Sequence, residues 1–250
     1  MLSALGFLSA AVTAQQIALM QVLGWMHWHH FAYMIVAIAL LGFGVAGTVL
    51  ALTRERLQRA WRSLLPWLAL GTAIAMPLGV RLAQQEALAV DLPLVFLNPP
   101  NAWRLVALCV LLLPPFFCGG LATGLVLTAQ ARRAGLFYSA SLAGAGAGGL
   151  AGLALVASVV PARLPAAVAA LALGSAACLW REATSRARIA IVVTAVAVAA
   201  AWLAPGELQP SQFKPIRRAL DLPDARVVAA GPGLHGWVQV VDAPALRPAP

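Results

Sequence analysis

Three of the four histidines of the chain lie in one short stretch, WMHWHH, at residues 25–30. His27 and His30 are three positions apart and could share a helical face beside His29, where imidazole nitrogens can bind zinc, copper or haem iron. Tryptophan and histidine are also typical of the aromatic belt at a membrane–water interface. No carboxylate or cysteine is close in sequence. The stretch therefore predicts no cofactor by itself, and His27, His29 and His30 are candidate metal or haem ligands that would need help from elsewhere.

A second candidate for chemistry is AGAGAGGLAG at residues 143–152, in which Gly144, Gly146 and Gly149 spell G-x-G-x-x-G. A dinucleotide site with that fingerprint needs a strand before it, a helix after it and an acidic residue about 20 positions on. Here the glycines lie inside a long apolar run, and the next acidic residue is Glu182, beyond another apolar run. The context therefore argues against nucleotide binding.

The same glycines fit a helix-packing stripe. Small residues recur every four positions and fall on one helical face: Ala140, Gly144, Gly148 and Gly152. Such stripes let two helix backbones approach closely inside a membrane. We expect residues 136–160 to form one continuous helix, buried among others at the packing centre of the bundle.

The remaining polar residues give little support for catalysis. Gln15, Gln16 and Gln21 share the first apolar run. Gln16 and the small residues near it could hydrogen-bond between helices, or the run could line a polar substrate path. No Asp, Glu, Lys or Arg lies in the middle of any apolar run, which disfavours a coupled pump. The sequence contains no Ser-His-Asp order, paired carboxylates or phosphate-binding loop, and its three cysteines indicate neither a disulfide nor a metal site. We predict no catalytic residue and no nucleotide-cofactor site.

The composition indicates a polytopic membrane protein. Of 250 residues, 62% are hydrophobic and only 10% are charged, whereas soluble domains carry about 25% charged residues. The net charge of +9 could suggest nucleic-acid binding. However, the basic residues sit in short gaps between apolar runs, as in membrane proteins, and no basic face with interleaved aromatics is present. The expected partners are membrane lipid and protein, not nucleic acid.

We expect an all-α polytopic fold with about seven transmembrane helices and a small β-hairpin tail. A span needs about 20 apolar residues. The predicted spans are Leu2–Leu23, Phe31–Leu52, Leu64–Val80, Trp103–Thr128, Leu136–Val160, Ala166–Trp180 and Ile189–Leu203. The last two are short and could instead form a hairpin of shallow helices. Proline and glycine predict kinks or breaks in the third and fourth spans: Pro66, Pro77, Pro114, Pro115, Gly119 and Gly120.

Loop charge predicts the orientation. One set of alternating loops holds nine arginines: Arg54, Arg56, Arg59, Arg62, Arg132, Arg133, Arg181, Arg186 and Arg188. The opposite set holds three: Arg81, Arg104 and Arg163. Cytoplasmic loops carry the excess of positive charge. The N-terminus is therefore predicted to be cytoplasmic, in a bacterial-type inner membrane, and with seven spans the tail lies outside the cytoplasm.

Residues 1–204 thus form the predicted helix bundle, and residues 205–250 an extramembrane linker and hairpin tail. Two β-like runs, Arg226–Ala230 and Trp237–Val241, flank a glycine-rich turn, which is a hairpin signal. A lone hairpin is marginal in water, so we expect it to dock on another surface. Val238 and Val240 are the predicted buried side, because they alternate on one face while Gln239 marks the other.

Five stretches carry a resemblance in their order along the chain: FLSAAVTAQQIALMQVLGW, LLLPPFFCGGLATGLVLT, GLFYSASLAGAGAGGLAG, PSQFKPIRRALDLPDARVV and GWVQVVDAPALRPAP. Together they resemble the membrane portion of membrane-bound spermidine synthase-like proteins, including the linker into the soluble domain. Enzymes of that family continue into a Rossmann-like aminopropyltransferase domain with a glycine-rich nucleotide loop and an aspartate that acts on the amine. The resemblance here covers the membrane portion only, with the catalytic domain absent, so no catalytic residue carries over.

Three functions follow as hypotheses. The first is a non-catalytic anchor or scaffold subunit for a partner or membrane complex. The second is a carrier or channel for a small molecule, such as an amine, which the broken helices and the helix-one glutamines would serve. The third is a metal- or haem-linked redox subunit that uses His27, His29 and His30. Aminopropyl transfer by this chain alone is not expected.

Overall fold

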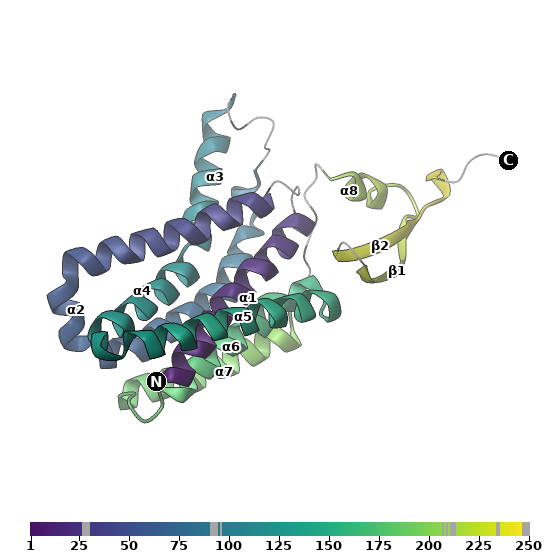
Figure 1. Ribbon diagram of the computed structural model, residues 1–250. Helices are drawn as coiled ribbons and strands as arrows, with labels where there is room; N and C mark the ends of the chain where they lie inside the picture. The colour runs from purple at the N-terminus through teal and green to yellow at the C-terminus, as the bar shows by residue number, and fades with distance from the viewer. Residues whose placement is uncertain are drawn as a thin grey trace.

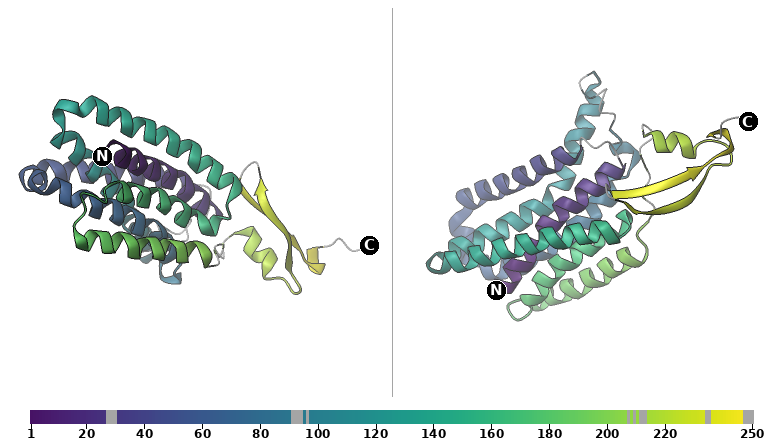
Figure 2. Two further views of the ribbon diagram at one scale, coloured as in Figure 1. Left: turned by 90° about the horizontal axis from the view of Figure 1, so that it is seen from below. Right: turned by 45° about the vertical axis from the view of Figure 1, so that its right-hand side comes forward.

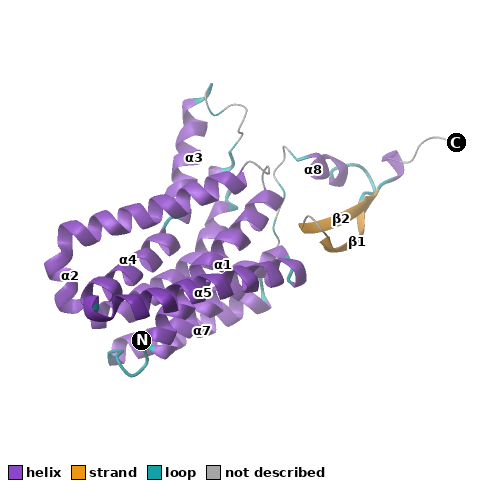
Figure 3. Ribbon diagram, in the orientation of Figure 1, coloured by secondary structure: helices purple, strands orange, loops and turns teal. Residues whose placement is uncertain are grey.

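The structure is a computed structural model that describes residues 1–26, 31–90, 95, 97–206, 208, 210, 214–233 and 236–246. It is a bundle of long helices with a two-stranded sheet at one end (Figures 1 and 3). The principal elements are α1 (Leu2–Met26), α2 (Phe31–Ala83), α3 (Pro99–Leu112), α4 (Pro114–Ala129), α5 (Ala134–Ser158), α6 (Leu164–Cys178), α7 (Ser185–Leu203), α8 (Pro215–Leu220), β1 (Arg226–Gly233) and β2 (Gly236–Asp242). The predicted helical class with a small C-terminal hairpin is confirmed.

Six helical segments in the described part of the chain are long and apolar enough to cross a membrane, judged by length and composition. One of them lies in α2 and has 51 residues. At 1.5 Å per residue a straight helix of that length would measure about 77 Å, more than twice a bilayer core of about 30 Å. α2 instead bends back on itself at Thr53, whose φ of −116° and ψ of 19° are not helical (Figure 1). It therefore contains both the second and the third predicted spans.

Proline acts differently in the two helices where it predicted a distortion. Pro66 and Pro77 lie inside α2, but within residues 31–83 the break in helical geometry is at Thr53. The break predicted at Pro114 and Pro115 is confirmed, because α3 ends at Leu112 and α4 begins at Pro114. Figure 1 shows α3 standing away from the bundle while α4 lies within it. A proline pair at the start of a helix lacks only N–H groups that would have no partner there anyway.

The centre of the bundle is α1. It packs against α2, α4, α5 and α6, and small residues on several of its faces are buried: Ala4, Ala10, Ala11, Ala14 and Ala18. The prediction that the glycine-bearing helix is buried at the centre is wrong. α5 is one continuous helix, but its buried residues are Phe137, Gly148 and Gly152, and large apolar side chains such as Leu150, 73% exposed, point outward. A small-residue stripe marks one close contact and leaves the other faces open.

The two ends of the bundle differ in charge. The N-terminus, the bend of α2 and the α4–α5 and α6–α7 connections lie at one end (Figures 1 and 2). Those connections and the bend carry the nine arginines of the predicted cytoplasmic set. The ends of α1 and α7, the α5–α6 connection and the hairpin lie at the other end.

The tail forms the predicted antiparallel hairpin. Val227 pairs with Val241, Ala230 with Gln239 and Pro232 with Trp237, with a bulge between Val227 and Ala229. The predicted buried face, however, is wrong. Val238 and Val240 are each 52% exposed, whereas Trp237 and Gln239 are partly buried toward the bundle. Both faces of β2 carry apolar side chains, so alternation alone does not select one. The face with the large indole docks, because it removes more apolar surface from water.

Candidate functional site

A cleft of about 590 Å³ lies between the end of the helix bundle and the tail. Figure 2 shows the hairpin beside that end of the bundle, near the end of α5. Five separate parts of the chain form its walls. These are the last turn of α1, the α5–α6 connection, the linker after α7, α8 and the inner face of the hairpin, which contribute Trp25, Val160–Arg163, Pro205, Gly206, Leu208, Pro210, Arg217, Leu220, Val227, Trp237 and Gln239.

Lys214 fastens the linker to the bundle beside this cleft. Its Nζ donates hydrogen bonds to the backbone oxygens of Gly24, at 2.5 Å, and Trp25, at 2.7 Å. Both carbonyls belong to the last turn of α1, where the helix leaves its oxygens without partners and where the macrodipole favours a cation. Burial lowers the pKa of the Lys214 ammonium from its ordinary value of 10.5. The tail is thus tied to α1 by a half-buried cation.

Arg163 ends the short 3₁₀ turn Pro161–Arg163 that connects α5 to α6. Its guanidinium carbon lies 5.5 Å from the centre of the Trp202 ring, near the end of α7. Among the residues that the structure describes, no carboxylate pairs with Arg163 and no carbonyl accepts a hydrogen bond from it. Its charge is therefore held on an aromatic face and remains available to the cleft.

Three other arginines at this end have oxygen partners. Arg81 donates to the backbone oxygen of Ala204, at 2.9 Å, and so caps the end of α7. Arg104 contacts the backbone oxygen of Ala89 at 3.5 Å. Arg217, in the cleft wall, forms an ion pair with Asp221 at 3.2 Å on the same helix. Arg163 thus stands apart from Arg81, Arg104 and Arg217 in lacking an oxygen partner within the described chain.

The chemistry of this cleft is that of a binding site. Most of its walls are apolar or aromatic, with two arginines and one amide converging on it, which is the usual make-up of a small-molecule site of 300–1,000 Å³. The described lining includes no serine, cysteine, histidine or acidic side chain. The charged groups of the described wall are therefore the two guanidinium groups of Arg163 and Arg217.

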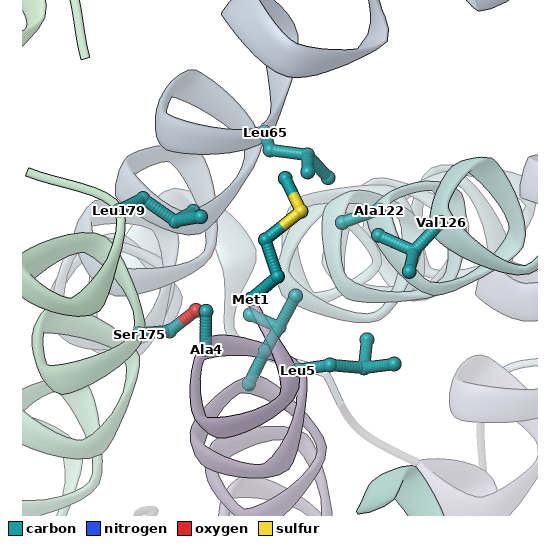
Figure 4. Close-up of a pocket in the computed structure, with 9 residues that line it drawn as sticks. Met1, Ala4, Leu5, Leu65, Ala122, Val126, Ser175 and Leu179 are labelled. Carbon is teal, nitrogen blue, oxygen red and sulfur yellow. The ribbon is translucent and has the colours of Figure 1, made fainter. Parts of the chain in front are cut away.

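A second cavity lies inside the bundle, between α1, α2, α4 and α6. Figure 4 shows Met1, Ala4 and Leu5 facing Leu65, Ala122 and Val126, with the Ser175 hydroxyl directed at Ala4. Its volume is about 10 Å³, which is roughly the space that one water molecule requires. The Ser175 Oγ is buried and has no hydrogen-bond partner. This cavity is too small for an organic ligand.

The predicted histidine ligands and the glycine stripe have different outcomes. His27, His29 and His30 lie outside the described residues. Elsewhere, the described part of the chain has no group of three His, Cys, Asp or Glu side chains able to hold a metal ion. The glycine stripe lies against α1. A Cβ on Gly144 would overlap the backbone of Gly6, and one on Gly148 the backbone of Ala10.

The stripe continues along α5 in both directions. A Cβ on Gly152 would come within 3.2 Å of the Ala14 Cα, and one on Gly6 within 3.5 Å of the Ala140 backbone oxygen. Ser9 of α1 and Ser141 of α5 share a hydrogen bond of 2.8 Å across the same contact. The four stripe residues therefore lie in the close packing contact between α1 and α5.

The glutamines of α1 do not form the expected interhelical pairs. Gln15 is only 1% exposed, and its Oε1 has no hydrogen-bond partner among the described residues. Gln16 and Gln21 are partly buried. The polar contact between α1 and α5 comes from two serines instead, because at this close approach only a short side chain fits between the backbones.

Sequence reasoning missed the cleft because its residues come from five segments and match no motif. Arg163 was counted only as a minority charge in the loop set that is poor in arginine. The low number of arginines in those loops was a signal that could have pointed to Arg163, since a cation on the less basic side needs a local partner.

Comparisons with protein-family models, with curated proteins and with solved structures found no match to this chain. The interpretation of the site therefore depends on its own geometry.

Proposed function

We propose that this chain is a non-catalytic, multi-pass protein of a bacterial-type inner membrane that holds a partner protein through its C-terminal hairpin. The observation that carries the proposal is the exposed outer face of that hairpin. Val228, Val238 and Val240 are each 52% exposed there. β-branched residues in strands are typical of surfaces that pack against neighbouring structure. This face is therefore a docking surface.

The edges of the sheet indicate what kind of partner fits. The sheet has two strands in the described chain, so each strand has one edge whose N–H and C=O groups lack strand partners. Open edges pair readily with another strand. Hydrocarbon cannot satisfy such groups, which argues for a protein rather than a lipid surface. The partner is a folded domain that adds a strand or a sheet to the hairpin.

The hairpin is positioned well for this role. Its inner face packs toward the bundle, with Trp237 and Gln239 in the cleft wall, and Lys214 ties the preceding linker to α1. A sheet held in this way presents its outer face in a fixed orientation, which lowers the entropy that a partner must lose on binding. The resemblance to the membrane portion of spermidine synthase-like proteins agrees with such a role, because in that family the corresponding linker leads into a soluble domain.

The orientation follows from the charged end of the bundle. The nine arginines of the α2 bend and of the α4–α5 and α6–α7 connections face the cytoplasm under the positive-inside rule. The hairpin is at the opposite end, so the partner docks outside the cytoplasm. A carrier for cationic amines is less well supported, since the cleft presents arginine and the described lining has no acidic side chain.

Site-specific photocrosslinking in native membranes tests this function. A benzophenone amino acid at Val240 should give one discrete protein adduct, and the pair Val238→Thr and Val228→Thr should abolish that adduct while keeping the β-branched shape. The control position is Val196, 64% exposed on α7, which should give lipid adducts. If Val240 yields no protein adduct and the chain purifies alone and monodisperse in mild detergent, the anchoring function is wrong.

A further inference from the structure

We propose that the cleft between the bundle and the hairpin binds an amphiphile with one anionic headgroup and a hydrocarbon chain. This ligand site lies on the inner face of the hairpin. The partner surface, with Val238 and Val240, lies on the outer face. The two sites are therefore independent, and either can be present without the other.

Charge selects an anion. Arg163 is half-buried in the wall and rests on the Trp202 ring, and no described carboxylate pairs with it. Arg217 adds a second guanidinium to the wall, and its Nε also forms an ion pair with Asp221. An arginine fork matches the oxygens of a carboxylate or phosphate. Within the described wall Arg163 has no acidic partner, and a cation in such an apolar wall is costly unless an anion joins it.

Shape and position select an amphiphile. The volume of about 590 Å³ exceeds the need of a small inorganic anion, and most of the wall is apolar, with Trp25 and Trp237 as its aromatic side chains. Trp25 is in the last turn of α1 and Trp202 in the last turn of α7. Tryptophan at the ends of apolar helices marks the level of the membrane–water interface. The headgroup thus sits at Arg163, at the depth where lipid headgroups lie, and the chain runs along the apolar wall.

Two sources supply this chemistry, a phospholipid of the bilayer and a free fatty acid. The experiment is quenching of tryptophan fluorescence by brominated chains, with the whole protein in mild detergent micelles. Dibrominated phosphatidylglycerol, dibrominated phosphatidylcholine and dibromostearate are titrated separately. The chain has 8 tryptophans, so the informative signal is the part of the quenching that Trp237→Phe removes.

We expect half-maximal quenching at about tenfold lower mole fraction for phosphatidylglycerol than for phosphatidylcholine, the ratio that one charge-assisted contact supplies. Arg163→Gln should remove that preference. The matched control is Arg218→Gln, because Arg218 is exposed on α8 and does not line the cleft. Preferential quenching by phosphatidylglycerol alone identifies a bilayer lipid, and equal potency of dibromostearate identifies a free acidic amphiphile.

Three results would overturn the proposal. The first is equal quenching by phosphatidylglycerol and phosphatidylcholine, with dibromostearate no better. The second is a loss of preference in Arg218→Gln as large as in Arg163→Gln, which would show general surface attraction. The third is a quenching component removed by Trp237→Phe that shows no preference for phosphatidylglycerol, which would place the preferred lipid elsewhere. Arg163→Lys guards against a folding defect, since it keeps the charge and should retain part of the preference.

Discussion

Replacing Lys214 with methionine should release the C-terminal tail from the bundle. The ammonium donates to the backbone oxygens of Gly24 and Trp25 in the last turn of α1. Methionine keeps most of the apolar length of the side chain and removes the charge and both hydrogen bonds. The carbonyls of α1 would then turn to water, and the linker would lose its direct tie to that helix.

The expected cost follows from these contacts. A hydrogen bond with a charged donor contributes about 1.5–3 kcal/mol, and a cation at a helix C-terminus adds about 0.3–1 kcal/mol. Burial of the ammonium, which lowers the pKa of Lys214, offsets part of this gain. A net loss of about 1–2 kcal/mol remains. That loss raises the ratio of undocked to docked tail about 5- to 30-fold.

Limited trypsin digestion in mild detergent measures the undocked fraction. Cleavage follows the open population when the tail opens and closes faster than the enzyme cuts. The site to follow is Arg226, whose side chain is 74% exposed but whose backbone lies in β1. Cleavage there should accelerate about 5- to 30-fold in Lys214→Met. The control is Arg218→Met, which also removes one charge, here from an exposed position of the same segment. It removes a trypsin site as well, whereas Lys214 precedes Pro215 and is not one.

Two results would refute this reasoning. Unchanged cleavage in Lys214→Met would mean that the cleft contacts alone hold the tail. Equal acceleration in Arg218→Met would mean that total charge on the tail matters rather than the contact with α1. Rapid cleavage at Arg226 in the unmodified protein would show a loose tail and would also weaken the anchoring function.

Three further predictions follow from the same structure. Because burial lowers the pKa of Lys214, the docked tail binds that proton more weakly than the free tail, and the neutral amine still donates to the two α1 carbonyls without the desolvation cost. Docking should therefore strengthen as pH rises through the lowered pKa toward 10.5. The ratio of Arg226 cleavage rates, Lys214→Met over unmodified, should rise with pH, and a flat ratio would contradict the assignment. Gly148→Ala should lower the free energy of unfolding in detergent by about 1–3 kcal/mol through overpacking against α1. The control Gly146→Ala, with open space around its Cβ position, should be neutral or stabilising. Equal effects of the two substitutions would mean that the α1–α5 contact is not close. Gln15→Met should raise the free energy of unfolding in detergent by about 1 kcal/mol, since it removes a buried oxygen that has no partner among the described residues. The control Gln16→Met should change it little. A loss of stability in Gln15→Met would reveal a polar partner for Gln15.

The sequence was sufficient to predict the helices and the hairpin, because those signals are local. Long apolar runs predicted the segments that are long enough to span a membrane, and Pro114 correctly marked the break between α3 and α4. The β-branched runs around a glycine-rich turn predicted β1 and β2. In each case the physical cause of the helix break or the strand lies within about a dozen neighbouring residues. It is a missing backbone N–H donor at proline, or a side chain that favours extended backbone in a strand.

The packing order could not be predicted in the same way. The stripe on α5 showed that some helix approaches closely, but not that α1, with alanines on several faces, occupies the centre. The sequence also did not determine which face of the hairpin packs on the bundle, because Val238 and Trp237 point in opposite directions and both are apolar. Long-range packing determines such cases, and local patterns in a single sequence do not show which helix end lies beside which strand.

The cleft is a product of this long-range packing, because segments that form no site individually together form a candidate binding site. An isolated two-stranded hairpin is marginally stable, so its order depends on what each of its faces contacts. The inner face gains from the apolar wall around Trp237, and Lys214 adds a tie to α1 that is independent of that wall. With the tail held from one side, the outer valines stay exposed at a fixed position instead of collapsing onto the bundle. Period-two alternation thus lets seven residues of β2 supply two surfaces, an inner one that we propose binds an amphiphile and an outer one that we propose binds a protein.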